Sequence, residues 1–192
     1  MVKAQAFLLA SVVISVALVM MYTPMRNEYL AKSTQILKQE YESKIFENVY
    51  NEIKNVVYFS FQNYNTCVRN TLDFLNFTDR YVRGKSLRFS GVLILANIST
   101  QLNLTVINFL EDRVKINIVL NGASFYDLTV ENRGINATIL SPSPGRNNMT
   151  LIYNDVNRVV FFEDSDRFFY LIDVKIEGEE FSKRMVEAFV FD

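Results

Sequence analysis

Few residues of this chain have the type and spacing that chemistry requires, and the tightest group is acidic. The run FEDSDR places Glu163, Asp164 and Asp166 close together, and hard cations such as Ca²⁺ accept clustered carboxylates as ligands. The run is shorter than a calcium-binding loop, however, and an acidic turn between two strands accounts for it without a metal. A second acidic run at positions 177–180 has the same explanation. We therefore predict no metal site.

The usual catalytic side chains are also missing. The sequence contains no histidine, which removes the most common general base and metal ligand. Its single cysteine, Cys67, has no histidine to activate its thiol, so we interpret it as a small buried apolar residue. Neither a phosphate-binding glycine loop nor a GxSxG motif occurs. The sequence predicts no catalytic residue, no cofactor and no enzyme.

Charge argues against a nucleic-acid partner. The formal net charge is −1, with 20 Lys and Arg residues interspersed among 21 Asp and Glu residues. A surface that binds a phosphate backbone needs a basic stripe, and none is visible in the sequence.

Asparagine supplies the one recurring modification signal. Five Asn-x-Ser/Thr tripeptides occur where composition alone predicts about two. We expect the side chains of Asn103 and Asn136, on the polar phase of strands, and of Asn148, in a Pro/Gly loop, to face water as a glycan requires. Asn97 is a further candidate, and Asn76 is expected to point inward because it follows Leu72 by four residues. Outward sites favour a domain exported from the cytoplasm.

An apolar stretch near the start of the chain precedes the predicted domain. Residues 6–22, AFLLASVVISVALVMMY, carry no charge, and nine of them are Leu, Ile, Val or Phe, which favours membrane insertion by roughly 3–5 kcal/mol. At about 1.5 Å per residue the stretch spans about 25 Å, slightly less than a hydrocarbon core. Bulky residues follow it, where a secretory cleavage site needs small ones. We expect a retained membrane helix with its short amino terminus in the cytoplasm.

The seven residues KAQAFLL carry a family resemblance. A basic residue and a small residue stand directly before Gln5, and an apolar run follows, which resembles the class III signal of archaeal type IV pilin-like proteins. The resemblance implies that a prepilin-type peptidase cuts between Ala4 and Gln5, with Lys3 as the basic residue, and leaves the apolar helix on the mature protein. An uncleaved membrane anchor is the alternative.

Helical periodicity continues beyond Pro24, where we expect a kink or break. Apolar residues recur every four positions from Leu37 to Val57, and Phe46 and Tyr50 widen the stripe, which predicts an amphipathic helix of roughly 30 residues that packs against its own domain. A shorter helix follows, with Asn65 or Thr66 as its N-cap and Gly84 as its stop. Its inward-facing residues are expected to be Val68, Leu72, Leu75 and Val82.

From about residue 87 the apolar period changes to two. The segments LNLTVINF and RVKINIVL alternate, GVLILA is apolar on both faces as in a central strand, and NG at 121–122 predicts a hairpin between 113–120 and 123–131. Further strands are expected near 149–153, 158–163, 167–176 and 181–190. Eight or nine short strands indicate an antiparallel sandwich or barrel. We expect its core to contain several aromatic residues: Phe161, Phe162, Phe168, Phe169, Tyr170, Phe189 and Phe191.

Together these patterns predict an α+β protein with three regions. A signal-like segment and transmembrane helix occupies 1–24, an amphipathic stem of two helices 25–84, and an antiparallel β head of about eight strands 85–192. This order resembles the pilin architecture. It implies a structural and adhesive subunit that assembles with itself or with other pilin-like subunits. The subunit would be held in the cell membrane with its β head outside, or built into a surface filament. The alternatives are an uncleaved, membrane-anchored extracytoplasmic binding module and, less favoured, an extracytoplasmic hydrolase.

Overall fold

The computed structural model describes residues 2–191, but in the first helix it does not describe the side chains of residues 2–14, 16–19, 21, 23 and 24. The described chain contains two helices and nine strands. It divides into two compact units, Met1–Lys44 and Ile45–Asp192. The boundary between the units therefore lies inside the region that the sequence assigned to the helical stem.

Helix α1 extends from Val2 to Ser60. The predicted break at Pro24 is therefore wrong, because the helix is continuous through that position. A proline removes only one N–H donor, and helix propagation on both sides is cooperative. Within the part of the chain that the structure describes, no helix is both long enough and apolar enough to cross a membrane. The span expected at 6–22 falls almost entirely on residues outside the described side chains, so it remains a prediction.

The first unit is a single helix, and its described large apolar side chains are exposed. Leu37 and Tyr41, which the periodicity assigned to a packing face, are both exposed. That part of the prediction is wrong, and the buried apolar residues of α1 begin at Ile45. The exposed large apolar residues of this unit are Met20, Tyr22, Met25, Tyr29, Leu30, Ile36, Leu37 and Tyr41.

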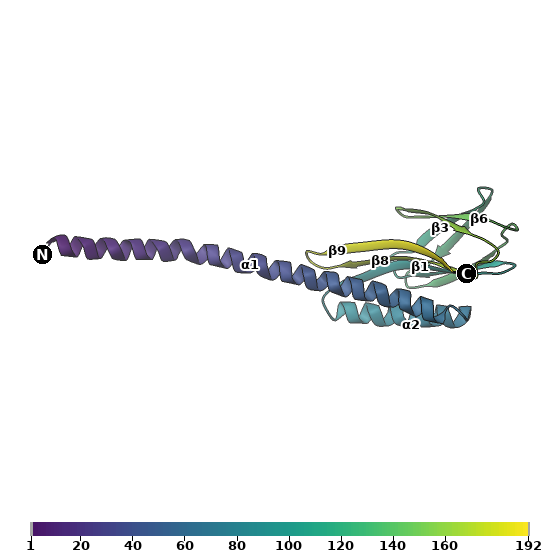
Figure 1. The fold of residues 1–192 in the computed structure, drawn as a ribbon, viewed down its shortest axis with the longest axis horizontal. Helices are drawn as coiled ribbons and strands as arrows, with labels where there is room; N and C mark the ends of the chain where they lie inside the picture. The colour runs from purple at the N-terminus through teal and green to yellow at the C-terminus, as the bar shows by residue number, and fades with distance from the viewer. Residues whose placement is uncertain (1, 192) are drawn as a thin grey trace. The chain divides into compact units, whose positions relative to one another are not determined.

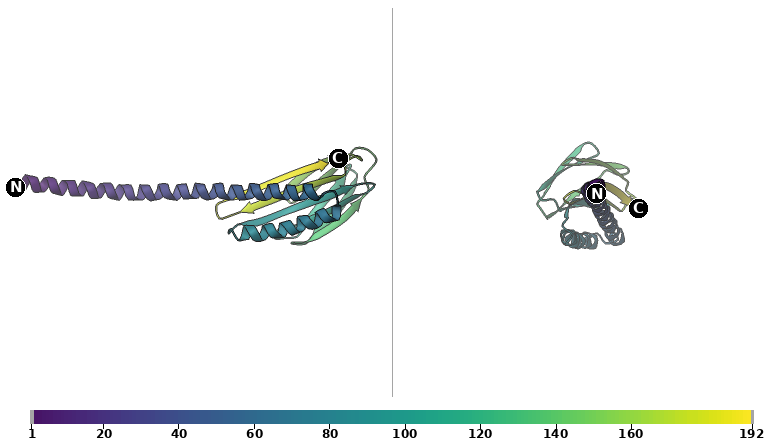
Figure 2. Two further views of the ribbon diagram at one scale, coloured as in Figure 1. Left: turned by 60° about the horizontal axis from the view of Figure 1, so that its bottom comes forward. Right: turned by 90° about the vertical axis from the view of Figure 1, so that its left-hand side faces the viewer.

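The second unit has three layers, and Figures 1 and 2 show the two helices on one face of the strands. Residues 45–60 of α1 are followed by a short turn and by α2, Tyr64–Arg83. The N-cap of α2 is Asn63, whose Oδ1 accepts a hydrogen bond from the Thr66 amide at 3.0 Å. The predicted caps Asn65 and Thr66 were two or three residues late, because Asn63 is the residue with extended backbone. Gly84 ends the helix as expected.

Nine strands form two antiparallel sheets, which confirms the predicted α+β class. The first sheet has the order β5-β2-β1-β8-β9 and the second the order β4-β3-β6-β7. The strands of the first sheet are β1 Arg88–Ile98, β2 Leu102–Asn108, β5 Ile135–Leu140, β8 Phe168–Glu177 and β9 Ser182–Phe191. Those of the second are β3 Val114–Leu120, β4 Ser124–Val130, β6 Asn147–Tyr153 and β7 Val156–Phe162.

The predicted Asn-Gly hairpin joins β3 to β4. Asn121 and Gly122 both have positive φ, 52° and 68°, as a type I′ turn requires. The Ala123 amide closes the turn on the Leu120 carbonyl at 3.2 Å. The strand residues Val114 and Val130 pair at the far end of the hairpin, so the register that the turn sets is kept along both strands.

Two apolar cores hold the unit together. One lies between the sheets and contains Ile94, Leu104, Ile118, Leu151 and Phe169 among others. The other lies between the first sheet and the helices, and α1 contributes Ile45, Phe46, Val49, Tyr50, Ile53 and Val57 to it. Strand β1 is buried on both faces, as its continuous apolar run GVLILA predicts, and β8 is buried on both faces as well. Phe161 does not join either core and is exposed, which corrects its predicted core position.

Candidate functional site

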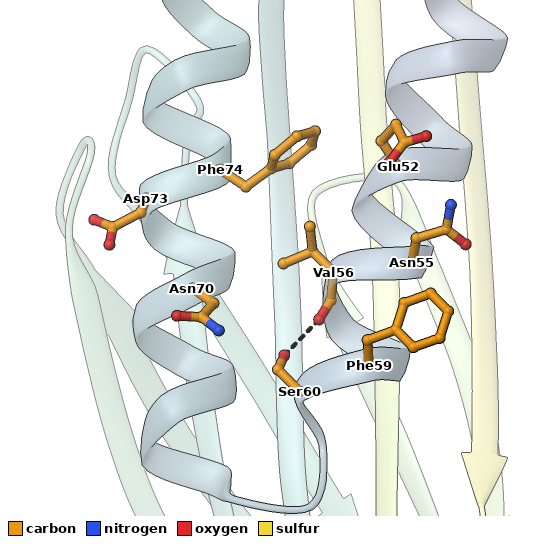
Figure 3. Close-up of a pocket in the computed structure, with 8 residues that line it drawn as sticks. All are labelled: Glu52, Asn55, Val56, Phe59, Ser60, Asn70, Asp73 and Phe74. Carbon is orange, nitrogen blue, oxygen red and sulfur yellow. Dashed lines mark hydrogen bonds between the residues drawn. The ribbon is translucent and has the colours of Figure 1, made fainter.

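A groove of the second unit lies between the two helices on their outer side. Its volume is about 550 Å³, and Figure 3 shows the side chains of Val56 and Phe74 between the two helices, whereas Asp73 points to the side of α2 away from α1. The lining residues are Glu52, Asn55, Val56, Phe59 and Ser60 of α1 and Asn70, Asp73 and Phe74 of α2. All eight belong to the second unit.

Local hydrogen bonding shapes the closed end of this groove. The Ser60 hydroxyl donates to the Val56 carbonyl, so it satisfies the last turn of α1 (Figure 3). The chain then reverses through residues 61–63, and the Asn63 amide donates to the Ser60 carbonyl at 3.3 Å. With Ser60 committed to the helix end, the groove offers a contact surface and no activated nucleophile.

The groove combines an apolar surface with two carboxylates. Phe59 is 78% exposed, and with Val56 and Phe74 it gives the groove an apolar character. Glu52 and Asp73 are exposed on opposite helices, and no cation is among the lining residues. Within the described chain, neither carboxylate has an ion-pair partner at hydrogen-bonding distance. This surface suits an occupant that brings apolar side chains together with positive charge.

A second polar site is a charged cluster at the edge between the two sheets. Asp173 of β8 is 3% exposed and accepts two hydrogen bonds from Arg184 of β9, both 2.8 Å long. Arg184 also reaches Asp155 at 2.6 Å, and the Tyr153 hydroxyl donates to Asp173 at 3.1 Å. A bidentate guanidinium is the geometry that compensates a buried carboxylate best.

The electrostatics of this cluster follow from burial and from Arg184. Burial, together with the neighbouring Asp173 carboxylate, raises the pKa of Tyr153 above its ordinary value. The hydrogen bond from Arg184 lowers the pKa of Asp155. A cavity of about 200 Å³ adjoins the cluster, but the carboxylates are occupied by Arg184. We interpret the cluster as a clamp that joins β8 and β9 to the β6–β7 turn, and sequence reasoning missed it because its members are far apart in the chain.

A third ionic contact ties α2 to the β sandwich. Asp79 is buried on α2 and accepts hydrogen bonds from Arg83 at 3.0 Å and from Arg133 at 2.8 Å. Burial disfavours the charged form of Asp79, but the two guanidinium groups outweigh it and hold the pKa of this carboxyl below its ordinary value. Arg133 lies in the β4–β5 turn at φ 52°. The contact therefore joins a helix to a loop, between residues that lie 54 positions apart in the sequence.

The acidic run at 163–166 acts as a set of turn caps. One carboxylate oxygen of Asp164 accepts a hydrogen bond from the Gly145 amide, and one of Asp166 accepts one from the Glu163 amide, both at 2.6 Å. Among the described residues, no group of three or more carboxylate, cysteine or histidine side chains has an arrangement that could hold a metal ion.

Cys67 is fully buried in the core between helix and sheet. Its Sγ lies 3.8 Å from the Val57 carbonyl oxygen, and burial raises the pKa of its thiol. A buried thiol with a raised pKa is a poor nucleophile, which agrees with the predicted packing role.

Three of the five candidate glycosylation asparagines are exposed. They are Asn76, Asn136 and Asn148, so the inward orientation expected for Asn76 is wrong. Asn136 Nδ2, the atom that a glycan would occupy, donates to the Thr129 carbonyl at 2.9 Å. A glycan on Asn136 would replace one of the two hydrogens of this bonded nitrogen, next to the contact between β5 and β4, whereas no such bond from Nδ2 of Asn76 or Asn148 is seen in the described structure.

The other two candidates face each other across the sheet. Asn97 of β1 and Asn103 of β2 are a cross-strand pair, and both are half-buried. Asn103 was expected to face water fully. Its position on the helix-covered side of the sheet, two residues from the buried Thr105, explains the difference.

The predicted processing residues Lys3, Ala4 and Gln5 belong to α1, but their side chains lie outside the described ones. The cleavage between Ala4 and Gln5 therefore remains a prediction from the sequence.

Comparison with known proteins identifies no family for this chain. The chain matches no protein-family model, no curated protein and no solved structure.

Proposed function

We propose that this chain is a structural and adhesive subunit of a cell-surface assembly of the pilin-like kind. In this proposal the apolar segment at 6–22 first holds the chain in a membrane. Helix α1 then associates with other subunits, of the same or a related kind, and the β sandwich forms the exterior. The subunit performs no catalysis.

One observation carries the proposal, namely the difference between the two units. The second unit encloses two apolar cores, whereas the first is a single helix whose described apolar side chains are exposed. Isolated helices are marginal in water, because most helical stability in proteins comes from packing an apolar face. The single helix of the first unit is therefore suited to packing against other helices.

Several features of the sequence support an extracytoplasmic, membrane-derived location. The class III signal-like residues Lys3, Ala4 and Gln5 precede an uncharged apolar run, so a prepilin-type peptidase is the proposed processing partner. Exposed Asn-x-Ser/Thr sites at Asn76 and Asn148 are compatible with glycosylation outside the cytoplasm.

The alternative is an extracytoplasmic binding module held by an uncleaved anchor. The groove between α1 and α2 favours this alternative, because concave apolar surfaces with a few polar groups are typical ligand sites. In such a module the groove would act on its own, without assembly of the chain.

Mass spectrometry of the native protein tests the proposed cleavage between Ala4 and Gln5. A mature chain that begins at Gln5 and enriches in filaments visible by electron microscopy supports it. A chain that retains Met1 and never sediments as an assembly contradicts it. Deletion of residues 1–24 separates the two candidates, because a filament subunit loses assembly whereas an anchored module keeps its ligand affinity.

A further inference from the structure

We propose that the groove between α1 and α2 receives the exposed apolar face of the first unit of a second copy of this chain. The inference rests on the proposed function and deepens it, because it names the two surfaces through which neighbouring subunits would meet.

The groove itself sets the chemistry of its occupant. Val56, Phe59 and Phe74 supply its apolar surface, and the exposed carboxylates of Glu52 and Asp73 stand on opposite helices with no cation among the lining residues. A neutral apolar occupant leaves this negative charge without compensation. The occupant that fits therefore carries apolar side chains flanked by positive charge.

An aromatic row lengthens the apolar surface along α2. The rings of Phe74 and Phe77 lie 6.1 Å apart, and those of Phe77 and Tyr81 also lie 6.1 Å apart and are stacked. Phe77 and Tyr81 are both exposed. Since these residues are seven positions apart at most, the row extends for about 10 Å along the helix. An elongated occupant such as a helix matches this surface better than a compact small molecule.

The first unit presents a matching face. Tyr22, Met25, Tyr29 and Ile36 follow one another at spacings of three, four and seven, so they lie on one side of α1. All four are exposed. Lys32 stands on the same side, three residues after Tyr29 and four before Ile36, and Arg26 lies one turn before Leu30 on the adjoining face.

The face also carries the Glu28 carboxylate, so Lys32 and Arg26 leave it with a net positive charge. Lys32 contacts Glu28 at 2.9 Å, but both side chains are about 70% exposed, and an ion pair of that kind is weak. A helix seated between two others packs at an interaxial distance of about 8–10 Å. In that position Lys32 and Arg26 of one copy would face Glu52 and Asp73 of its neighbour.

This contact joins two different surfaces, so it is heterologous. Each copy would offer its groove to one neighbour and its helix face to another. Heterologous contacts that do not close into a ring produce open-ended assemblies. The inferred contact therefore predicts growth by addition of subunits at the ends.

Charge reversal in the full chain tests the contact. The variant E52K/D73K should need at least a tenfold higher concentration to assemble than the wild type, as measured by sedimentation. The variant R26E/K32E should show the same loss, and the fourfold variant E52K/D73K/R26E/K32E should recover assembly. The matched control E111K/D112K reverses the same number of carboxylates in the β2–β3 loop and should assemble like the wild type. Circular dichroism should show unchanged folding for all of them, because the substituted side chains are exposed.

A disulfide between copies provides a second readout. A copy carrying N70C in the groove, mixed with one carrying S33C on the helix face, should form a cross-linked dimer. The control N157C, on the second sheet, should not cross-link to S33C. If the wild type assembles but neither charge reversal nor N70C has an effect, the groove contact is overturned and the proposed function stands. If the wild type does not assemble, both are overturned.

Discussion

Ile36 and Ile53 belong to the same helix and have the same side chain, yet 57% of Ile36 is exposed and none of Ile53 is. The two residues lie in different units of the structure. Around Ile53, α2 and the first sheet complete an apolar core. Around Ile36 the first unit provides only one helix. The comparison shows that the apolar periodicity of a helix predicts that a face will be covered, but not whether its own domain covers it.

The largest expected effect is the loss of a core side chain in the second unit. We expect Ile53→Ala to lower the free energy of unfolding by about 4 kcal/mol, because it removes buried methyl groups and leaves a cavity. The matched change Ile36→Ala should alter it by less than about 0.5 kcal/mol, since the residue is exposed. Urea unfolding of the two full-length variants, followed by near-ultraviolet circular dichroism, measures both. Equal losses would mean that both residues are packed within one chain.

Breaking an ion pair should also cost more free energy of unfolding in the second unit than in the first, with smaller effects than those of the core substitutions. Arg184→Met leaves the buried Asp173 carboxylate without its bidentate partner and should cost about 3 kcal/mol. Lys32→Met breaks the exposed pair with Glu28 and should cost at most about 0.5 kcal/mol. Thermal unfolding monitored at the same protein concentration checks both. A small effect of Arg184→Met would show that water reaches Asp173 and that the clamp does not stabilise the sheet edge.

The stability of the second unit should depend on pH through Asp79. The pKa of this carboxyl is lowered in the folded chain, so its contribution is fully present above the unfolded value of about 3.9 and is lost as the pH falls through the folded value. We expect Asp79→Asn to cost about 1–2 kcal/mol at pH 6 and almost nothing at the acid end of the stable range. Urea unfolding between pH 6 and about pH 2 tests this. A cost that does not change with pH would exclude the ionic contribution.

The smallest effect concerns the turn that separates the two helices of the second unit. Asn63→Ala removes the N-cap hydrogen bond of α2 and should cost about 1 kcal/mol. Asn65→Ala, at the cap position expected from the sequence, should be nearly neutral. Thermal unfolding of the two variants decides between the positions, and the opposite order of effects would restore the original expectation.

Much of the fold could be predicted because its signals are local. The Asn-Gly turn specifies β3 and β4, and the apolar run GVLILA identifies β1 as a strand that is buried on both faces. Helix ends were harder, since Asn63, Asn65 and Thr66 are all acceptable caps by residue type. Only the backbone conformation at Asn63 distinguishes them.

The sites depended on contacts that the sequence does not encode locally. The clamp joins three segments, namely the β6–β7 turn with Tyr153 and Asp155, β8 with Asp173, and β9 with Arg184. The groove exists because α2 packs beside α1. The apolar periodicity of each helix predicts which of its faces is buried against the sheet, but it does not predict a groove on the opposite side of the helix pair. The exposed position of Asn76 was missed for a similar reason, since it lies at the margin of the apolar face of α2.

Hydrogen–deuterium exchange of the full chain tests the difference between the two units most directly. In dilute monomer we predict strong protection of the amides of residues 45–60 and weak protection of residues 25–44, although both belong to α1. On assembly, protection of residues 25–44 should rise towards that of residues 45–60, because neighbouring helices then cover the exposed face. Equal protection of the two segments in the monomer, with no change on assembly, would contradict the account.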